Sequence, residues 1–431
     1  MTYGTYKWWA ACGVLAVIAG ACSTMPSRRP APVVLEPAPV EPVPVPPPPP
    51  FPVMLGVDVL ASQRFAAIAG KRVALLTHDA ARNRSGEPTW SVLYRAPEVD
   101  LVALLVAEHG LDGKAPASAI IRGDTHSRTG LPVYSLYGDT RRPTSRLLKQ
   151  FDTLVIDLQD IGTRSYTFIS AMREALEACV LAGVEVVVLD RPNPLGGVKV
   201  SGPGVDEEWR SYVGSFPVPY VHGLTIGELA RLALRSENVL ELDEDQRASA
   251  RVVIVPMRGW KRAMRWADTG LRWQPTSPYI QDVDTVEGYP MTGLGCILGG
   301  WTHGVGRDRP FRGLAFRGKP ADQLVKELSA LDIPGLGFRK VEVAGANGKK
   351  LHGTVVDITD WDAVRLTGLS FHMMRLACVW SGGNPFRSAS KVEEQIFNRH
   401  VGSSAWWRAL RRDGARVDVR AFVDAWEAEA E

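Results

Sequence analysis

The chain has 431 residues, which is long enough for two or three domains with cores of their own. Hydrophobic residues make up 45% of the chain and charged residues 23%, the balance of a globular protein. The 50 basic and 47 acidic side chains give a formal net charge of +3. This near-neutral charge, without a run of Lys and Arg among aromatic residues, argues against a nucleic-acid partner.

The first residues predict export. Lys7 is followed by an apolar stretch over residues 8–19, which is too short for a stable transmembrane helix but typical of a signal peptide. The stretch ends in Ala19-Gly20-Ala21-Cys22, which resembles a lipoprotein processing site. We therefore expect a signal peptide over residues 1–22 and an acylated Cys22 that anchors the chain to a membrane. Ordinary secretory cleavage just before the cysteine is the alternative.

Residues 23–52 are dominated by proline, which lacks an amide donor and fixes φ. We expect an extended, polyproline-type stalk that rises about 3.1 Å per residue. Ser23 stands where an aspartate retention signal would stand, which favours the outer membrane of a cell with two membranes. The expected location is therefore the cell envelope, with the protein lipid-anchored at the periplasmic face of the outer membrane.

The cysteines and histidines give little support to metal chemistry. Beyond Cys12 and Cys22 the chain has only Cys179, Cys296 and Cys378, with no CxxC pair, and its eight histidines include no HExxH. One disulfide among the last three cysteines and three buried thiols are both open at this point. No metal site is expected.

From residue 53 onward, strands and helices alternate. In chain order we predict a helix over residues 62–69 and strands over 72–77, 99–107 and 153–157, then a helix over 165–181 and a strand over 184–190. The runs of β-branched residues without polar alternation are typical of parallel strands covered by helices. The predicted fold is α/β with a Rossmann-like parallel sheet. No GxGxxG or P-loop follows any strand, so neither a nucleotide nor another cofactor is expected.

Further along the chain, Thr225 and Glu228 form a capping box before a helix over residues 226–234. We expect the catalytic domain to span residues 53–260 and a smaller α+β auxiliary domain to span 261–431. Residues 273–311 are rich in Pro, Gly, Thr and Trp and show little periodicity, which predicts a long ordered loop over the site. Two amphipathic helices are predicted near the end, over residues 392–398 and 419–428.

Polar side chains follow four of the predicted strands. Ligands of parallel sheets bind beyond the carboxyl ends of the strands, so these side chains predict an active site at one sheet edge. For any single one of them, a helix cap or a solvated loop end is the alternative. The groups are Thr77-His78, Glu108-His109, Asp157 with Asp160, and Asp190-Arg191.

Five long motifs carry a resemblance to a known family. In chain order they are residues 107–113 (AEHGLDG), 129–138 (TGLPVYSLYG), 157–167 (DLQDIGTRSYT), 190–197 (DRPNPLGG) and 222–229 (HGLTIGEL). The series, which extends from about Gly56 to the C-terminus, resembles the exo-β-N-acetylmuramidases of the NamZ type, glycoside hydrolase family 171. The resemblance implies a Rossmann-like catalytic domain, a smaller C-terminal domain and release of terminal N-acetylmuramic acid from peptidoglycan fragments.

The resemblance also implies catalytic roles. Glycoside cleavage normally needs a carboxylic acid that protonates the leaving oxygen and a second group at the anomeric carbon. Glu108, which matches the proposed catalytic glutamate of the family, is the expected general acid, with His109 beside it. Asp160 is the candidate for the second carboxylate or for orienting water. A structural turn aspartate is the alternative for Asp160.

N-acetylmuramic acid carries a lactyl carboxylate, which a guanidinium can pair with bidentately. Arg164, Arg191 and Arg307 are the candidates for this contact. Hydrogen bonds to the sugar hydroxyls or the acetamido group are expected from Asn193, His222 and Tyr137.

The chain departs from the family pattern at three places, residues 77–81 (THDAA), 276–279 (TSPY) and 298–302 (LGGWT). In the last of these, Gly299 stands where a glutamate is expected. The leading hypothesis is an exo-acting glycoside hydrolase. An inactive envelope lipoprotein that binds peptidoglycan or muramyl sugars is the alternative. An esterase or deacetylase is a third possibility, which no GxSxG and no metal-ligand cluster supports.

Overall fold

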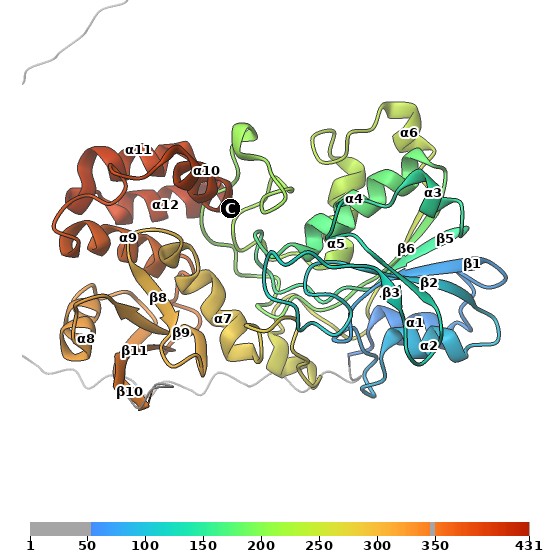
Figure 1. Ribbon diagram of the computed structural model, residues 1–431, viewed down its shortest axis with the longest axis horizontal. Coiled ribbons are helices and arrows are strands. Elements are labelled where there is room, and N and C mark those ends of the chain that lie inside the picture. The colour runs from blue at the N-terminus through green and yellow to red at the C-terminus, as the bar shows by residue number, and fades with distance from the viewer. Residues whose placement is uncertain (1–52, 345–349, 431) are drawn as a thin grey trace, which may run out of the picture. The chain divides into compact units, whose positions relative to one another are not determined.

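The computed structural model describes residues 53–344 and 350–430 (Figure 1). The predicted signal peptide, the acylated Cys22 and the proline-rich stalk lie outside the described residues. Within them, no helix combines the length and the apolar character that crossing a membrane requires.

A seven-stranded sheet forms the first lobe, which we call the sheet lobe. Its strands lie in the order β3-β4-β2-β1-β5-β6-β7, and every neighbouring pair is parallel except β3 with β4. The strands are β1 (Arg72–Leu76), β2 (Asp100–Val106), β3 (Asp124–Thr125), β4 (Pro132–Ser135), β5 (Thr153–Ile156), β6 (Glu185–Leu189) and β7 (Val252–Val255). This α/β sheet, parallel except at β3, confirms the predicted fold class and the four predicted strands, and it adds β3, β4 and β7.

Helices cover both faces of this sheet (Figure 1). Val73 and Leu75 of β1 pack with α1 (Gly56–Ser62) and α2 (Thr89–Arg95). Ala74 and Leu76 of the same strand belong to the core of the other face, with α4 (Phe168–Leu181) and α5 (Ile226–Arg235). Short helices α3 (Ser145–Leu148) and α6 (Glu244–Ala248) complete the lobe. Burial on both faces explains why these strands show no polar alternation.

The capping box of α5 is confirmed, and a buried carboxylate supports it. Thr225 accepts a hydrogen bond from the backbone N–H of Glu228, whose side chain accepts one from the N–H of Thr225. Asp190, at the end of β6, accepts hydrogen bonds from the N–H of Gly227 (2.8 Å) and the hydroxyl of Thr225 (3.1 Å). Burial raises the pKa of Asp190 to about 6. Asp190 therefore fixes the start of α5 to the sheet edge.

Two predicted elements are wrong in extent. The helix expected over residues 62–69 is a series of turns, because Arg64 and Phe65 have φ of 51° and 54°, in the left-handed region that cannot continue an α-helix. The ordered helix, α1, ends where the predicted one began. The predicted helix over residues 165–181 is confirmed but starts at Phe168.

The segment expected to be a long loop contains regular elements. Helix α7 (Val283–Thr292), β8 (Trp301–Gly304) and the start of β9 (Arg309–Phe316) lie inside residues 273–311. Helix α7 is buried on most sides, including at Thr285, Glu287 and Pro290, so its sequence lacks the apolar stripe of a surface helix.

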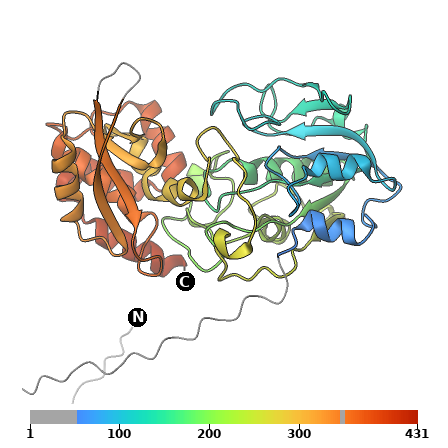
Figure 2. The ribbon, with the colours of Figure 1, turned by 90° about the horizontal axis from the view of Figure 1, so that it is seen from below.

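The C-terminal lobe begins with α7 and contains a four-stranded antiparallel sheet in the order β10-β11-β9-β8. Its longest pair is the hairpin of β10 (Leu336–Ala344) and β11 (Lys350–Ile358), coloured orange in Figure 2. Helices α8 (Ala321–Ser329), α9 (Gly368–Trp380), α10 (Lys391–Val401), α11 (Ser404–Asp413) and α12 (Val419–Ala430) complete the lobe. The two helices predicted near the C-terminus correspond to α10 and α12. Cys179, Cys296 and Cys378 are free thiols, so no disulfide forms among these three.

Arg164 joins the two lobes from the interior. Its side chain is fully buried and donates hydrogen bonds to the carbonyl oxygens of Pro203 (2.7 Å) and Val218 (2.8 Å) in the sheet lobe. It also donates to those of His400 (3.3 Å) and Val401 (2.8 Å) at the end of α10. Burial lowers the pKa of Arg164 to about 10, so the guanidinium stays charged at neutral pH.

Gly402 makes this approach possible. Its φ is +89°, and a Cβ there would lie 2.5 Å from Nη2 of Arg164 and 2.4 Å from the carbonyl oxygen of Gly204. Only glycine fits this position without displacing the guanidinium or the backbone.

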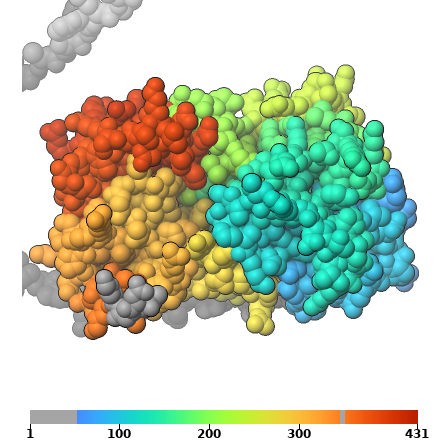
Figure 3. Space-filling model, in the orientation of Figure 1, coloured from blue at the N-terminus to red at the C-terminus, as the bar shows by residue number. Residues whose placement is uncertain are grey.

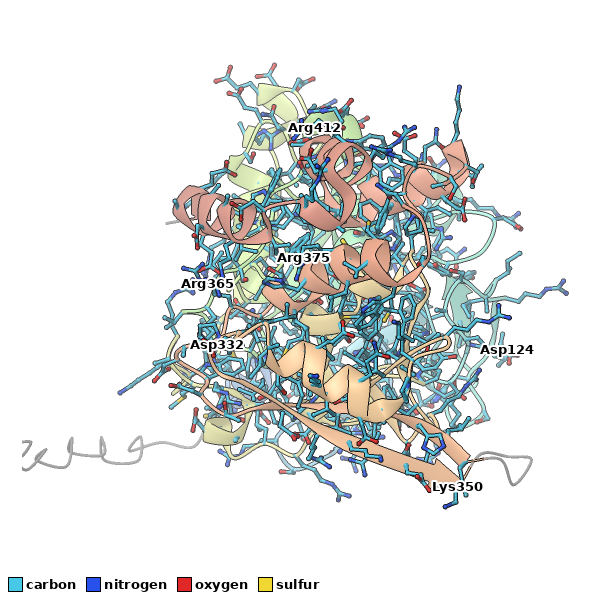
Figure 4. The ribbon with its side chains drawn as sticks, turned by 90° about the vertical axis from the view of Figure 1, so that its left-hand side faces the viewer. Asp124, Asp332, Lys350, Arg365, Arg375 and Arg412 are labelled. Atoms are coloured by element: carbon cyan, nitrogen blue, oxygen red, sulfur yellow. The ribbon has the colours of Figure 1, made fainter. Side chains whose placement is uncertain are left out.

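The interior position of Arg164 predicts a large effect on stability. Leaving a buried carbonyl without its donor costs about 1 kcal/mol or more, so Arg164→Met is expected to lower the free energy of unfolding by at least ~3 kcal/mol. Arg412→Met is the control, because Arg412 is exposed on the C-terminal lobe (Figure 4) and, among the described residues, its side chain pairs only with Asp413. Urea denaturation followed by tryptophan fluorescence measures both changes. Equal, small losses in the two variants would contradict the proposed role of Arg164.

Candidate active site

A cavity of about 670 Å³ lies between the two lobes. The loops after β2, β4 and β5 form one wall, and the connection after β6, residues between Ser277 and Phe311 and His400 form the rest of the lining. Figure 3 shows the face on which the orange segments of the C-terminal lobe approach the teal segments of the sheet lobe. The volume is within the usual range for small-ligand sites and is sufficient for one or two sugar units.

Glu108 presents its carboxylate to this cavity. The side chain is 7% exposed, and both of its oxygens are oriented by donors. Oε1 accepts a hydrogen bond from the N–H of Ser118 (2.8 Å), and Oε2 accepts one from the hydroxyl of Thr167 (2.5 Å). Among the described residues that line the cavity, Glu108 is the only Asp or Glu.

His109 lines the cavity next to Glu108. Its φ is 72°, an unfavourable conformation for a residue other than glycine, and such strain is concentrated at functional sites. Nδ1 lies 2.8 Å from the carbonyl oxygen of Ala115, to which it donates. In the neutral imidazole, Nε2 is therefore a hydrogen-bond acceptor.

Six tyrosines line the cavity and offer hydroxyl groups to it. Burial and the nearby charge of Glu108 together raise the pKa of Tyr137 to about 12. Burial also raises the pKa values of Tyr212 and Tyr289. The hydroxyl of Ser165 forms hydrogen bonds with the hydroxyls of Tyr220 (2.7 Å) and Tyr289 (3.2 Å). These groups are protonated at neutral pH and suit the recognition of sugar hydroxyls.

Two arginines line the cavity. The guanidinium of Arg141 lies 3.4 Å from the ring centre of Tyr137 and 4.9 Å from that of Tyr212. Arg307, from the turn between β8 and β9, is the second. No carboxylate of the described residues forms an ion pair with either arginine. Stacking on two rings orients the guanidinium of Arg141 for an anionic substrate group.

Histidines complete the wall on the side of the C-terminal lobe. His303 stacks on Phe311 with ring centres 4.0 Å apart, and its Nδ1 accepts a hydrogen bond from the N–H of Phe311 (3.2 Å). Burial lowers the pKa of His303. The ring is therefore neutral at pH 7 and carries its proton on Nε2. His400, whose carbonyl oxygen contacts Arg164, also lines the cavity.

Asp160 is not among the lining side chains. Its Oδ2 accepts a hydrogen bond from the N–H of Gly162 (2.7 Å) and lies 3.3 Å from Nε2 of His222. Nδ1 of His222 accepts from the N–H of Leu224, so the proton of His222 is on Nε2, which has no hydrogen-bond partner among the described residues. The structure thus places Asp160 and His222 together in the interior, away from the position expected for direct contact with a sugar.

Three other residues were predicted to contact the substrate, but in the structure their side chains bond other groups of the protein. Arg164 bonds the four carbonyls described above. Arg191 pairs with the fully buried Asp157 through Nε (2.5 Å) and Nη2 (2.8 Å). Asn193 donates to the carbonyl oxygen of Leu224 and accepts from the N–H of Leu195. None of the three lines the cavity between the lobes.

The position of Gly299 does not bear on the cavity directly. Its φ is +106°, and a Cβ there would lie 2.9 Å from the Cβ of Ala377 on α9. Gly299 is not among the lining residues, whereas Tyr279, from the second altered motif, is. In the first altered motif, His78 is buried, and burial with the charge of Arg191 lowers its pKa to about 3, so it is neutral.

Sequence reasoning missed several lining residues. Thr167 stands at the end of a recognised motif, and Arg141 comes three residues after another, so proximity to a motif was the available signal. Tyr212, Tyr289 and His400 come from segments without any motif, and only the fold brings them to the cavity. In the described part of the chain, no group of three His, Cys, Asp or Glu side chains could hold a metal ion.

Comparisons with known proteins agree with this architecture. Residues 73–284 match the family profile described as exo-beta-N-acetylmuramidase NamZ, N-terminal, and residues 288–431 match its C-terminal counterpart. The chain is 38% identical over 326 residues to the peptidoglycan beta-N-acetylmuramidase NamZ of Bacillus subtilis (strain 168). That alignment covers 74% of this chain and 76% of the relative.

Two solved structures, both of DUF1343 family proteins from Bacteroides fragilis NCTC 9343, are similar in fold. The first has a TM-score of 0.78 and 36% identity, and the match covers 89% of this chain and 98% of that one. The second has a TM-score of 0.60 and 23% identity, over 88% of this chain and 96% of that one, and supports the fold alone. The profile matches and the Bacillus relative show that the chain belongs to the NamZ family of exo-β-N-acetylmuramidases.

Proposed function

We propose that the cavity hydrolyses the glycosidic bond of a terminal N-acetylmuramic acid in peptidoglycan fragments, with Glu108 as the proton donor. The observation that carries this proposal is the placement of Glu108, the only carboxylate among the lining residues, with both oxygens oriented by Ser118 and Thr167. The Bacillus relative is a peptidoglycan beta-N-acetylmuramidase, which supports the same reaction class.

Glu108 is the only carboxylate among the described lining residues, which limits the mechanisms that the cavity can support. Most glycosidases use two carboxylates, but some substrates with a 2-acetamido group supply the second group themselves. We propose that the acetamido oxygen attacks the anomeric carbon while the bond to the leaving oxygen breaks and that oxygen takes the proton of Glu108. Water then attacks the anomeric carbon, the bond to the acetamido oxygen breaks, and the carboxylate of Glu108 takes a proton from that water.

Arg141 is the group best suited to select the muramyl substrate. The lactyl carboxylate distinguishes N-acetylmuramic acid from N-acetylglucosamine, so selection needs a cation in the cavity. Arg141 is oriented by Tyr137 and Tyr212, whereas Arg164 and Arg191, the residues first expected in this role, are engaged in the interior. Arg307, from the turn between β8 and β9, also lines the cavity and provides a second cation.

We also propose that an acyl group on Cys22 anchors the enzyme to the envelope and that the proline-rich stalk carries it towards the wall. The Ala19-Gly20-Ala21-Cys22 sequence supports the anchor, and Ser23 favours the outer membrane.

Replacement of Glu108 tests the catalytic proposal. General acid catalysis contributes about 10²- to 10⁴-fold, so Glu108→Gln is expected to lower turnover of a MurNAc–GlcNAc disaccharide by that factor. Binding of the disaccharide, measured by calorimetry, should persist because Gln keeps the shape of the side chain. Glu98→Gln, at an exposed glutamate, is the control. Binding without turnover in the wild-type protein would instead support the inactive lipoprotein.

Replacement of Arg141 tests substrate selection. Losing a charge-assisted hydrogen bond costs about 1.5–3 kcal/mol, so Arg141→Gln is expected to raise KM for the muramide about 10- to 100-fold. Activity on the matching N-acetylglucosaminide, which lacks the lactyl group, should not fall. Arg146→Gln, at an exposed arginine of α3, is the control. A parallel loss on both substrates would show that Arg141 does not read the lactyl carboxylate.

Replacement of Cys22 tests the anchor. Cells that express the wild-type chain and receive labelled palmitate should yield labelled protein in the membrane fraction, and Cys22→Ser should abolish the label. Cys12→Ser should retain it, because Cys12 lies within the predicted signal peptide. Unlabelled wild-type protein in the soluble fraction would favour ordinary secretory cleavage.

A further inference from the structure

A second cavity, of about 550 Å³, opens at the same edge of the seven-stranded sheet. It is lined by the loop after β1 (residues 80–86), by Gln159 after β5 and Arg191 after β6, and by residues between Trp266 and Gln274. Strands β1 and β5 are neighbours, but β2 lies on the outer side of β1 and β6 on the outer side of β5. The strand order therefore reverses between β1 and β5, and open parallel sheets bind ligands at such points.

The lining of this second cavity is strongly basic. It includes Arg82, Arg84, Arg191 and Arg272 and no Asp or Glu from the described residues. The charge of Arg191 is matched by Asp157. The described carboxylates form no ion pair with the other three arginines. Asp58 contacts the loop, but it accepts hydrogen bonds from the backbone N–H groups of Leu55 and Arg84.

Buried polar atoms in the lining lack partners in the described structure. Nε1 of Trp266, on a residue that is 6% exposed, has no acceptor, and neither does Nε of Arg82. Oε1 of Gln159, on a residue that is 2% exposed, has no donor, although its Nε2 bonds the carbonyl oxygens of Asp160 and Pro192. Buried polar groups are normally satisfied, so these atoms offer hydrogen-bonding capacity to a ligand or to water. A matching ligand needs anionic acceptors and at least one donor.

We propose that this second cavity binds the carboxylate of an organic acid that also carries hydroxyl or amide donors. Peptidoglycan fragments offer this chemistry in two places, the lactyl group of N-acetylmuramic acid and the carboxylates of the stem peptide. The volume fits a monosaccharide or a dipeptide. Only the choice of wall fragments as the source rests on the proposed function. The arginines and the unpartnered atoms do not depend on it.

The second cavity is close in sequence to the first. Gln274 lines the second cavity, whereas Ser277 and Tyr279, a few residues further along, line the first. The segment over residues 274–279 therefore contributes to the lining of both cavities. Replacement of Arg84 and Arg272, which are exposed and lie outside the first cavity, allows the second site to be tested separately.

Calorimetric titration of the full chain tests the proposal with four probes: N-acetylmuramic acid, the dipeptide L-alanyl-D-glutamate, neutral N-acetylglucosamine and inorganic phosphate. We expect one or both of the organic acids to bind, with an affinity at least ~10-fold lower in the Arg84→Gln/Arg272→Gln variant. The variant Arg141→Gln/Arg307→Gln, altered in the first cavity, should lose the N-acetylmuramic acid that binds there but keep the binding that depends on Arg84 and Arg272. Whichever acid binds identifies its source as the sugar or the peptide.

Hydrolysis separates this result from the catalytic proposal. The Arg84→Gln/Arg272→Gln variant should cleave the MurNAc–GlcNAc disaccharide at the wild-type rate, which also shows that it is folded. Organic-acid binding that is insensitive to this variant, or absent from the wild-type protein, would overturn the second site. Phosphate bound as tightly as the organic acids would overturn the requirement for a donor group. Equal binding of N-acetylglucosamine would overturn the requirement for a carboxylate.

Discussion

The guanidinium of Arg164 bonds carbonyl oxygens from three separate segments of the chain, and the cavity between the lobes depends on this contact. Pro203 and Val218 belong to the long connection between β6 and α5, which also supplies Tyr212 and Tyr220 to the cavity. Val401 ends α10, directly after His400, another lining residue. Because no described carboxylate pairs with Arg164, four carbonyl dipoles stabilise its charge in the interior. The positions of Tyr212, Tyr220 and His400 in the cavity lining are therefore fixed from inside the protein.

The polar side chains at the carboxyl edge of the sheet have three different roles. Glu108 and His109, after β2, face the cavity between the lobes. Asp157 and Arg191 form a buried ion pair beneath the basic cavity, and Asp190 fixes the start of α5. The same edge thus carries a cavity with one carboxylate and two arginines and, at the strand reversal between β1 and β5, a basic cavity without a described carboxylate. Two such cavities suit a substrate that has both a bond to protonate and carboxylates to bind.

Much of the fold could be predicted from sequence because its signals are local. Continuous apolar runs identified β1, β2, β5 and β6, and the Thr225–Glu228 capping box identified the start of α5. The helix predicted over residues 62–69 failed because left-handed residues at Arg64 and Phe65 leave little trace in composition. Helix α7 was missed because burial on several sides removes the periodicity by which a surface helix is identified.

The site was less predictable because an ionisable residue in a motif can either contact the substrate or pair with buried groups of the protein itself. Glu108, His109, Tyr137 and Arg307 do line the cavity, as their motifs and the covering segment suggested. Arg164 and Arg191 have the right chemistry for a carboxylate, yet the fold gives them internal partners that no spacing reveals. Arg141 stands outside every motif, and only the rings of Tyr137 and Tyr212 show that it is oriented for binding.

A crystal structure of the Glu108→Gln protein with a bound MurNAc–GlcNAc disaccharide would test the central claim most directly. The account predicts that the N-acetylmuramic acid lies in the cavity between the lobes, with the glycosidic oxygen about 3 Å from the side chain of residue 108. Its acetamido oxygen should lie beneath the anomeric carbon, and its lactyl carboxylate should face Arg141. A disaccharide bound elsewhere, or a second protein carboxylate at the anomeric carbon, would contradict the proposed mechanism.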